Sequence, residues 1–263
     1  MDKKNKIDMS KYRPFAKSTL SCEVREIKEK KIVWPEMIKR DLGDGIVSRI
    51  IEKKDIVNVA EFWRESYPEI YGSQHEWMLR PEEYEGRVAL KDNLKEDSEN
   101  KIYFISIGEV EKSGKIMFAN MVTKYDHNLQ IELTFFAIHP DVRKGKGGFN
   151  IWKELSEFYK WVEATGAEYV TVFLETWHNT TQHIWFQRMG FKIAGIFPGN
   201  YTRWCGDQNE YRGCTVHMYR LINNGEKYTN NSTDWKLLPE VKELWDFMEK
   251  INAKSEDIAI KDI

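Results

Sequence analysis

One stretch, residues 131–155, constrains the fold more than any other part of the chain: I-E-L-T-F-F-A-I-H-P-D-V-R-K-G-K-G-G-F-N-I-W-K-E-L. It predicts a buried strand, a turn at Pro140, a basic glycine loop and a helix. A glycine loop that leads into a helix presents unpaired backbone N–H groups and the positive end of the helix dipole, and both favour a phosphate group. The sequence therefore predicts a site for a phosphate-bearing ligand. The alternative is a basic surface turn, because a short glycine motif is a weak signal by itself.

An antiparallel meander is expected to lead into this stretch. Apolar and β-branched residues predict strands over residues 102–110, 115–124 and 131–138, joined by tight turns. A strand over 45–51 and a helix over 54–67 are expected before them. The aromatic segment 67–77 is either a loop whose rings line a pocket or ordinary packing.

A parallel strand pair is expected after the glycine loop. An amphipathic helix over 149–162 and a strand over 168–176 give a strand–helix–strand order, which predicts a right-handed crossover. A second helix follows over 179–189, with Asn179 as its N-cap and Gln182 completing a near capping box. Residues 191–197 and 213–222 are expected to form a closing hairpin, joined by a long polar loop.

These elements predict a mixed α/β domain over residues 45–222. An N-terminal extension is expected over 1–44, and a linker with a C-terminal helix over 223–263.

Composition excludes several classes of function. The formal net charge of −2 gives no general attraction to nucleic acid or to anionic membranes. No apolar run approaches the length of a membrane span, and no signal sequence follows the charged start, so a cytoplasmic protein without a membrane partner is expected. Three cysteines are too few and too scattered for a disulfide framework or a zinc site, and no metal is expected.

The glycine loop has neither P-loop nor Rossmann spacing. The order of the elements, together with I-H-P-D-V-R-K-G-K-G-G-F and N-T-T-Q-H-I-W-F-Q-R-M-G-F, resembles the GNAT acyltransferase superfamily across residues 45–222. The first motif is similar to that family's [RQ]-x-x-G-x-[GA] pyrophosphate loop, and the second to its N-x-x-A-x-x-x-Y-x-x-x-G-F helix. If Lys144 leads the loop motif, Phe149 stands where Gly or Ala is usual. If Arg143 leads, Lys146 takes a glycine position, so the register stays open.

The resemblance implies acetyl-CoA as the acyl donor. The pyrophosphate would lie on the glycine loop, the pantetheine arm beside the end of the strand over 131–138, and the thiol end near the second helix. In that helix Gln182 replaces the usual Ala and Phe186 stands where Tyr is frequent. Asn179 is either a helix cap or a ligand contact, or both. The implied CoA-binding residues are Phe136, Ala137, Ile138, Arg143, Lys144, Gly145, Lys146, Gly147, Gly148, Phe149, Asn179 and Phe186.

Glu132 is the candidate general base. It is a charged residue in an apolar strand, which is costly unless it faces solvent or has a task. The segment E-L-T-F-F-A-I is similar to the E-I-V-F-C-A-I strand of histone-acetylating GNAT members, whose glutamate is the base. Partial burial would raise the pKa of Glu132 toward neutrality, which suits a base. The alternative is an exposed strand-end glutamate.

The general acid is less constrained. Phe186 has no proton to give, so Tyr201 is the candidate, with solvent as the alternative. Glu175 and His178 are minor candidates, and His139 is expected to be structural.

The expected function is therefore transfer of an acetyl group from acetyl-CoA to a primary amine. The acceptor is a small-molecule amine or a peptide lysine, nucleic acid is not an expected partner, and a homodimer is left open. The alternative is a non-catalytic GNAT-fold module that binds CoA or a partner.

Overall fold

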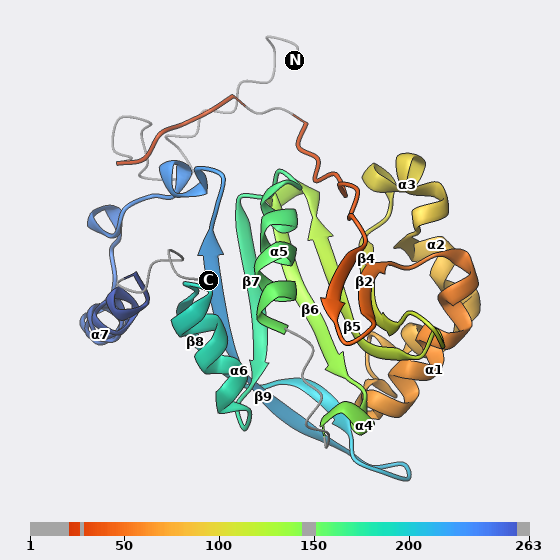
Figure 1. Ribbon diagram of the computed structural model, residues 1–263. Helices are drawn as coiled ribbons and strands as arrows, with labels where there is room; N and C mark the ends of the chain where they lie inside the picture. Colours follow the sequence, from red (N-terminus) through yellow and green to blue (C-terminus); the bar gives the residue numbers. More distant parts are fainter. Residues whose placement is uncertain (1–20, 27–28, 144–150, 257–263) are drawn as a thin grey trace, which may run out of the picture.

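The computed structural model describes residues 21–26, 29–143 and 151–256. Its centre is one twisted sheet of nine strands, eight of them in the order β1-β2-β4-β5-β6-β7-β9-β8 (Figure 1). Neighbours along this order are antiparallel except β6 and β7, which are parallel. The eight strands are β1 (Arg40–Gly43), β2 (Ile46–Ile50), β4 (Tyr103–Val110), β5 (Ile116–Tyr125), β6 (Gln130–Ile138), β7 (Tyr169–Glu175), β8 (Lys192–Trp204) and β9 (Glu210–Leu221). The two-residue β3 (Val88–Ala89) pairs with β4.

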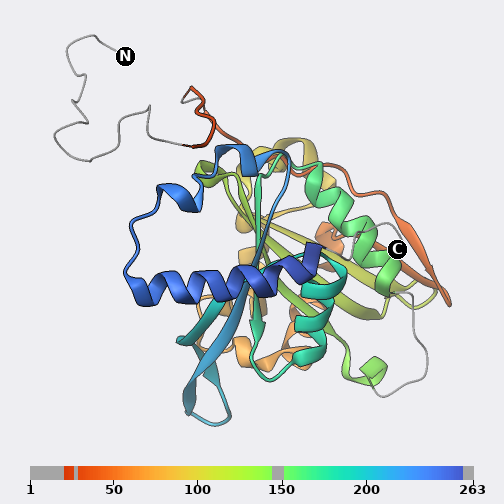
Figure 2. The ribbon, with the colours of Figure 1, turned by 90° about the vertical axis from the view of Figure 1, so that its left-hand side faces the viewer.

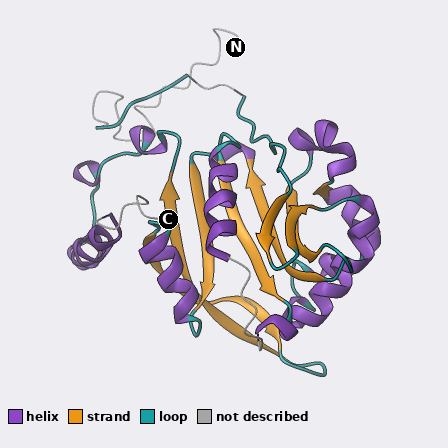
Figure 3. Ribbon diagram, in the orientation of Figure 1, coloured by secondary structure: helices purple, strands orange, loops and turns teal. Residues whose placement is uncertain are grey.

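Helices cover both faces of the sheet (Figure 3). The crossover helix α5 (Ile151–Glu163) and α6 (Asn179–His183) lie over one face, which we call the α5 face. Helices α1 (Ile56–Ser66) and α2 (Tyr84–Arg87), with the short 3-10 turns between them, pack against the other, which we call the α1 face. The remaining helices are α3 (Leu94–Asn100), α4 (Pro140–Arg143) and α7 (Pro239–Glu256). Among the residues described, no helix is both long and apolar enough to cross a membrane.

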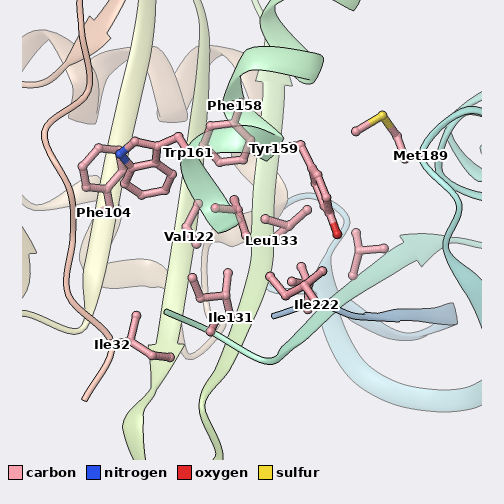
Figure 4. Close-up of a cluster of buried hydrophobic side chains, with 14 of the residues drawn as sticks. Ile32, Phe104, Val122, Ile131, Leu133, Phe158, Tyr159, Trp161, Met189 and Ile222 are labelled. Carbon is pink, nitrogen blue, oxygen red and sulfur yellow. The ribbon is translucent and has the colours of Figure 1, made fainter. Parts of the chain in front are cut away.

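Each face has its own hydrophobic core. On the α5 face, Phe158, Trp161 and Val162 of α5 pack on strand residues such as Ile131 and Leu133 (Figure 4). On the α1 face, buried side chains of α1 pack on β4 and β5. Side chains alternate between the two faces along a β-strand. A strand residue next to a member of one cluster therefore lies on the opposite face.

The expected meander and the expected parallel pair are both present. Strands β4, β5 and β6 follow one another as antiparallel neighbours, and α5 connects β6 to the parallel β7. The mixed α/β class predicted from the sequence is therefore confirmed. The helix between β6 and β7 returns the chain to the same end of the sheet, and a parallel strand pair needs such a crossover connection.

The end of the segment expected as an N-terminal extension takes part in the sheet. Arg40–Gly43 forms the edge strand β1, and Ile32 and Trp34 are fully buried. The Trp34 ring stacks on Trp161 at a centroid distance of 5.7 Å, and its Nε1 donates to the carbonyl oxygen of Lys101 over 2.9 Å. This segment lacks periodicity because it crosses the end of the sheet in an extended form, so only its single anchoring side chains are buried.

The closing hairpin differs from the expectation. The segment expected as a long polar loop is mostly strand, because β8 runs to Trp204 and β9 starts at Glu210. The ladder is irregular between Phe197 and Tyr201, where Gly199 has a φ of 61° that favours glycine. Both faces of this half of the hairpin are polar or aromatic, so no apolar alternation marks it. Tyr201 consequently lies on a strand.

The second helix also differs at its start. Helix α6 begins at Asn179, but its N-cap is His178, whose Nδ1 accepts from the backbone N–H of Thr181 over 3.3 Å. Gln182 makes no capping box, because its Nε2 donates instead to the carbonyl oxygen of Glu175 over 2.8 Å. The helix continues as a π-helical turn over Ile184–Arg188. The capping role expected for Asn179 is therefore wrong, and its exposed side chain is left for other contacts.

The C-terminal helix protects the edge of the sheet. The Asn252 side chain of α7 is buried, accepts from the backbone N–H of Ile193 in β8 over 2.8 Å and donates to the carbonyl oxygen of the same residue over 3.0 Å. A side-chain amide thus takes the place of the next strand, which blunts an edge otherwise open to pairing. Figure 2 shows α7 lying across this side of the molecule.

Candidate active site

The two parallel strands separate half-way along the sheet. The ladder between β6 and β7 runs from Gln130 opposite Tyr169 to Leu133 opposite Val172, whereas the strands continue to Ile138 and Glu175 (Figure 1). The separation begins where β6 carries a bulge, because Met121 and Val122 of β5 pair with Phe135 and Leu133. The bulged Thr134 is held by a 2.6 Å hydrogen bond between its hydroxyl and that of Thr123. The opening therefore starts at Thr134, in the middle of the sheet.

Glu132 lies just before this opening. It pairs with Thr171 of β7 and lies on the α1 face, because its neighbours Ile131 and Leu133 belong to the opposite core. Tyr125 Oη donates to Glu132 Oε2 over 3.1 Å. Burial raises the pKa of Glu132, and the Tyr125 hydrogen bond opposes that rise. A carboxylate with a raised pKa, next to an opening in the sheet, is suited to accept a proton.

A second carboxylate, Glu175, ends β7 on the same face and is surrounded by donors. Tyr201 Oη and the guanidinium of Arg203 donate to its two oxygens, and Tyr67 Oη lies 3.4 Å from Oε1. The Arg203 guanidinium lies 4.9 Å from the centroid of the Tyr67 ring. Desolvation and the Glu175 hydrogen bond raise the pKa of Tyr201 to about 12, so its hydroxyl keeps its proton at neutral pH. The charge of Glu175 is thus compensated by Arg203, whereas the donor to Glu132 among the described residues is the uncharged Tyr125.

The segment between α1 and α2 forms an aromatic wall across from these strands. Tyr67 and His75 contact the Phe135 ring at centroid distances of 5.3 and 5.0 Å, and Trp77 lies 4.8 Å from Tyr103. Burial, with a contribution from Arg203, lowers the pKa of His75 to about 4, so this imidazole is neutral near pH 7. For the aromatic segment 67–77, the sequence left open whether its rings line a pocket or simply pack. In the structure, Tyr67 and His75 of this segment pack on Phe135, beside the opening.

The residues expected to bind CoA are divided among several surroundings. Phe136 is 41% exposed and Ala137 is buried, and both lie on the part of β6 that has separated from β7, as does Ile138. Asn179 is exposed at the start of α6. Phe186, in the π-helical turn, packs against the core of the α5 face.

The rest of the glycine loop lies outside the described residues. This applies to Lys144, Gly145, Lys146, Gly147, Gly148 and Phe149, and Arg143 ends α4 just before them. The loop's register therefore stays a prediction. Across the described ranges, no group of three or more His, Cys, Asp or Glu side chains is placed to hold a metal ion.

Sequence reasoning missed several groups of the site. Tyr125 donates to Glu132, His75 packs on Phe135 and Arg203 pairs with Glu175, which the sequence offers only as a minor candidate. An arginine alternating with tyrosine on a strand has no distinctive pattern. Arg203 meets its partner Glu175, 28 residues away in the sequence, only because β7, β9 and β8 lie side by side.

Comparison with known proteins identifies the architecture. No protein-family model and no curated protein sequence matches this chain. Among solved structures, the ribosomal-protein-S5-alanine acetyltransferase of Vibrio fischeri is similar at 11% identity and a TM-score of 0.52, over 72% of this chain and 98% of that protein. A spermidine/spermine N-acetyltransferase of Vibrio cholerae aligns at 13% identity with a TM-score of 0.48, over 72% of this chain and 97% of that one. An acetyltransferase of the GNAT family from Streptococcus pneumoniae aligns at 19% identity with a TM-score of 0.45, over 67% and 99%.

At 11% identity the similarity to the Vibrio fischeri structure concerns the fold alone, and it accompanies a meander followed by a parallel strand pair with a crossover helix in this chain. The chain therefore has the fold of the GNAT acetyltransferase superfamily.

Proposed function

We propose that this chain is an acetyl-CoA-dependent N-acetyltransferase that acetylates a primary amine, with Glu132 as its general base. The observation that carries the proposal is the position of Glu132: a carboxylate with a raised pKa, on the strand that separates from its parallel neighbour two residues later. The GNAT fold supports the reaction class, because separation of this strand pair leaves backbone groups available to an extended ligand.

The donor side of the site fits acetyl-CoA. Strand β6 from Thr134 onward lies along the opening, where a pantetheine amide can hydrogen-bond as an added strand. The crossover helix α5 starts after the basic glycine loop, so its N-terminus offers N–H groups and a favourable dipole to the pyrophosphate. Asn179 is proposed to contact the thiol end, since it does not cap α6. Phe186 and the loop residues from Arg143 to Phe149 are kept as proposed contacts on the family resemblance.

The acceptor side supplies the proton chemistry. An amine attacks the thioester carbonyl only when neutral, and the N–C bond forms as the C–S bond breaks. We assign removal of the amine proton to Glu132, with Tyr125 orienting its carboxylate. We propose that solvent protonates the leaving sulfur and then restores Glu132. Tyr201, the acid candidate from the sequence, keeps its proton at a pKa of about 12 but donates it in a hydrogen bond to Glu175, about 13 Å along β7 from the position opposite Glu132.

The test compares the wild type with Glu132→Gln and Tyr125→Phe in an assay of thiol release from acetyl-CoA with a panel of amines. Glu132→Gln is expected to lower kcat about 100-fold, in the usual range for a general base, and to leave acetyl-CoA binding by calorimetry unchanged. Tyr125→Phe removes a hydrogen bond that lowers the pKa of Glu132. The acidic limb of the pH–rate profile of this variant should therefore move to higher pH. Full activity of Glu132→Gln at neutral pH excludes this residue as the base. Absence of acetyl-CoA binding by the wild type refutes the proposed function as a whole.

A further inference from the structure

Three aromatic rings lie on the α1 face beyond Glu132, and the proposed chemistry does not use them. They are Phe173 of β7, His217 of β9 and Phe197 of β8, which we call the ring platform. Phe173 stacks on His217 with centroids 4.3 Å apart and planes 14° from parallel. Phe197 lies 5.3 Å from His217 and 6.3 Å from Phe173.

The strand register connects the platform to the candidate base. Glu132 pairs with Thr171, and Phe173 is the next residue of β7 on the same face, about 7 Å further along the strand. Phe173 in turn pairs with His217. The platform therefore begins one side chain away from Glu132, on the β7 side of the opening.

The platform is apolar, uncharged and partly open to solvent. Phe173 is 37% exposed and Phe197 is 42% exposed, although both are large hydrophobic side chains on a sheet face. Burial lowers the pKa of His217, and its Nε2 is buried without a hydrogen-bond partner among the residues described. At neutral pH the imidazole therefore contributes a flat neutral ring.

The nearest carboxylate at the far end of the platform does not offer a free charge. Glu175 follows Phe173 on the same face, but Arg203 and Tyr201 occupy its oxygens. A ligand lying from Glu132 along β7 would thus meet a carboxylate first, then aromatic rings, and then a compensated ion pair. That sequence matches a molecule with an amine at one end and an apolar ring at the other.

We infer that the acceptor is a primary amine with an aromatic or flat apolar body, which stacks on Phe173 and Phe197 while its amine lies at Glu132. This inference rests on the proposed function and names its substrate class. The platform is continuous with Glu132 and adjoins the opening and the aromatic wall that contains Tyr67. This position beside the proposed base favours a small acceptor over a second protein chain.

The experiment measures kcat/KM for three amines: 2-phenylethylamine, n-butylamine and spermidine. Phenylethylamine is expected to be preferred over n-butylamine by about tenfold, which corresponds to about 1.4 kcal/mol and is the size of one aromatic contact. Spermidine tests whether a carboxylate recognises a second ammonium group of the acceptor. The candidate carboxylate is Glu69 on the aromatic wall, because its Oε2 is buried without a hydrogen-bond partner in the described part of the chain. Equal use of all three amines, or a preference for spermidine, overturns the inference while leaving the acetyltransferase proposal standing.

Variants localise the effect. Phe173→Ala and Phe197→Ala are each expected to lower kcat/KM for phenylethylamine about tenfold, with less than about a twofold change for n-butylamine and for acetyl-CoA. Phe247→Ala on α7, where the ring is 60% exposed, is the matched control and should change neither. If both platform variants use phenylethylamine as well as the control does, the rings do not bind the acceptor.

A direct binding measurement keeps the inference falsifiable if turnover is low. Saturation-transfer NMR of phenylethylamine with the CoA-loaded wild type should show contact with the ring protons, and Phe173→Ala should lose it. Contact that survives in both platform variants refutes the assignment. Failure to bind CoA, by contrast, refutes the proposed function itself.

Discussion

The ion pair between Arg40 and Glu154 gives the sharpest prediction about stability. Arg40 lies on the edge strand β1, and Glu154 lies in the first turn of α5, the helix that follows the glycine loop. The guanidinium donates to both carboxylate oxygens, over 2.7 and 3.2 Å, and the Ser48 hydroxyl adds a 2.8 Å hydrogen bond. The two side chains are only 15% and 4% exposed. The pair therefore fixes the start of α5 to the sheet from inside the protein.

The expected cost follows from this burial. Removing one partner of a buried ion pair leaves an uncompensated charge and costs about 3–5 kcal/mol. Because the Ser48 hydrogen bond would remain, we expect Arg40→Met to lie near the lower limit, at about 3 kcal/mol. Replacing both partners, as Arg40→Met with Glu154→Leu, should recover stability to within about 2 kcal/mol of the wild type, because two apolar side chains need no compensation but the buried Ser48 hydroxyl loses its acceptor.

Urea unfolding followed by tryptophan fluorescence measures these differences. With a slope of about 3 kcal/mol per M, the midpoint of Arg40→Met should fall by about 1 M. The control is Lys160→Ala on the same helix, which removes an exposed pair with Glu157 and should cost no more than about 0.5 kcal/mol. If Arg40→Met costs no more than this control, or the double variant is less stable than Arg40→Met, the reasoning about burial is refuted. A raised KM for acetyl-CoA in Arg40→Met would further show that the pair positions the helix N-terminus.

Three other predictions follow from single contacts. A Cβ at position 213 would lie 2.2 Å from the Tyr201 ring, so Gly213→Ala should displace that ring from Glu175 and cost about 1 kcal/mol of stability, as much as Tyr201→Phe does. An unchanged urea midpoint for Gly213→Ala would show that the ring can move without losing this hydrogen bond. Asn252→Leu should cost about 2–3 kcal/mol and speed hydrogen exchange at the Ile193 amide, because two buried hydrogen bonds are lost; unchanged exchange there would contradict the edge-protection role. Since the folded pKa of Glu132 is raised, its ionisation costs stability as pH rises above its ordinary value of 4.5, so Glu132→Gln should be more stable than the wild type at pH 7 but not at pH 4; the reverse order of urea midpoints would contradict a raised pKa.

Several features of the fold are local enough for the sequence to specify them. Alternating apolar residues fixed the three meander strands to within one residue at most ends, and the helical period of the crossover segment located α5. The parallel pair followed from element order, because a helix between two strands leads to a crossover connection. Glu132 was also identifiable, since a charged residue in an apolar strand stands out without any knowledge of its partners.

Local patterns misjudged the places where tertiary contacts compete with them. At α6 the sequence favoured Asn179 as the cap, but Gln182 is drawn to the Glu175 carbonyl and His178 takes that role. On β8, Tyr201 is held in a strand because its ring packs over Gly213 of the neighbouring strand, a contact that no short-range pattern records.

The sequence by itself thus determined the order of the elements, the reaction class that the order resembles and the strand that carries the candidate base. Only the tertiary structure decided what lies beside that base and along the same face of the sheet: the β6–β7 separation and the Tyr125 hydrogen bond, then the ring platform and the compensated Glu175. The physical reason is that these groups come from strands and turns distant in the sequence, and sheet pairing alone brings them to one face. A sequence pattern reports how each residue relates to its near neighbours, whereas burial and pKa depend on the groups that packing places around it.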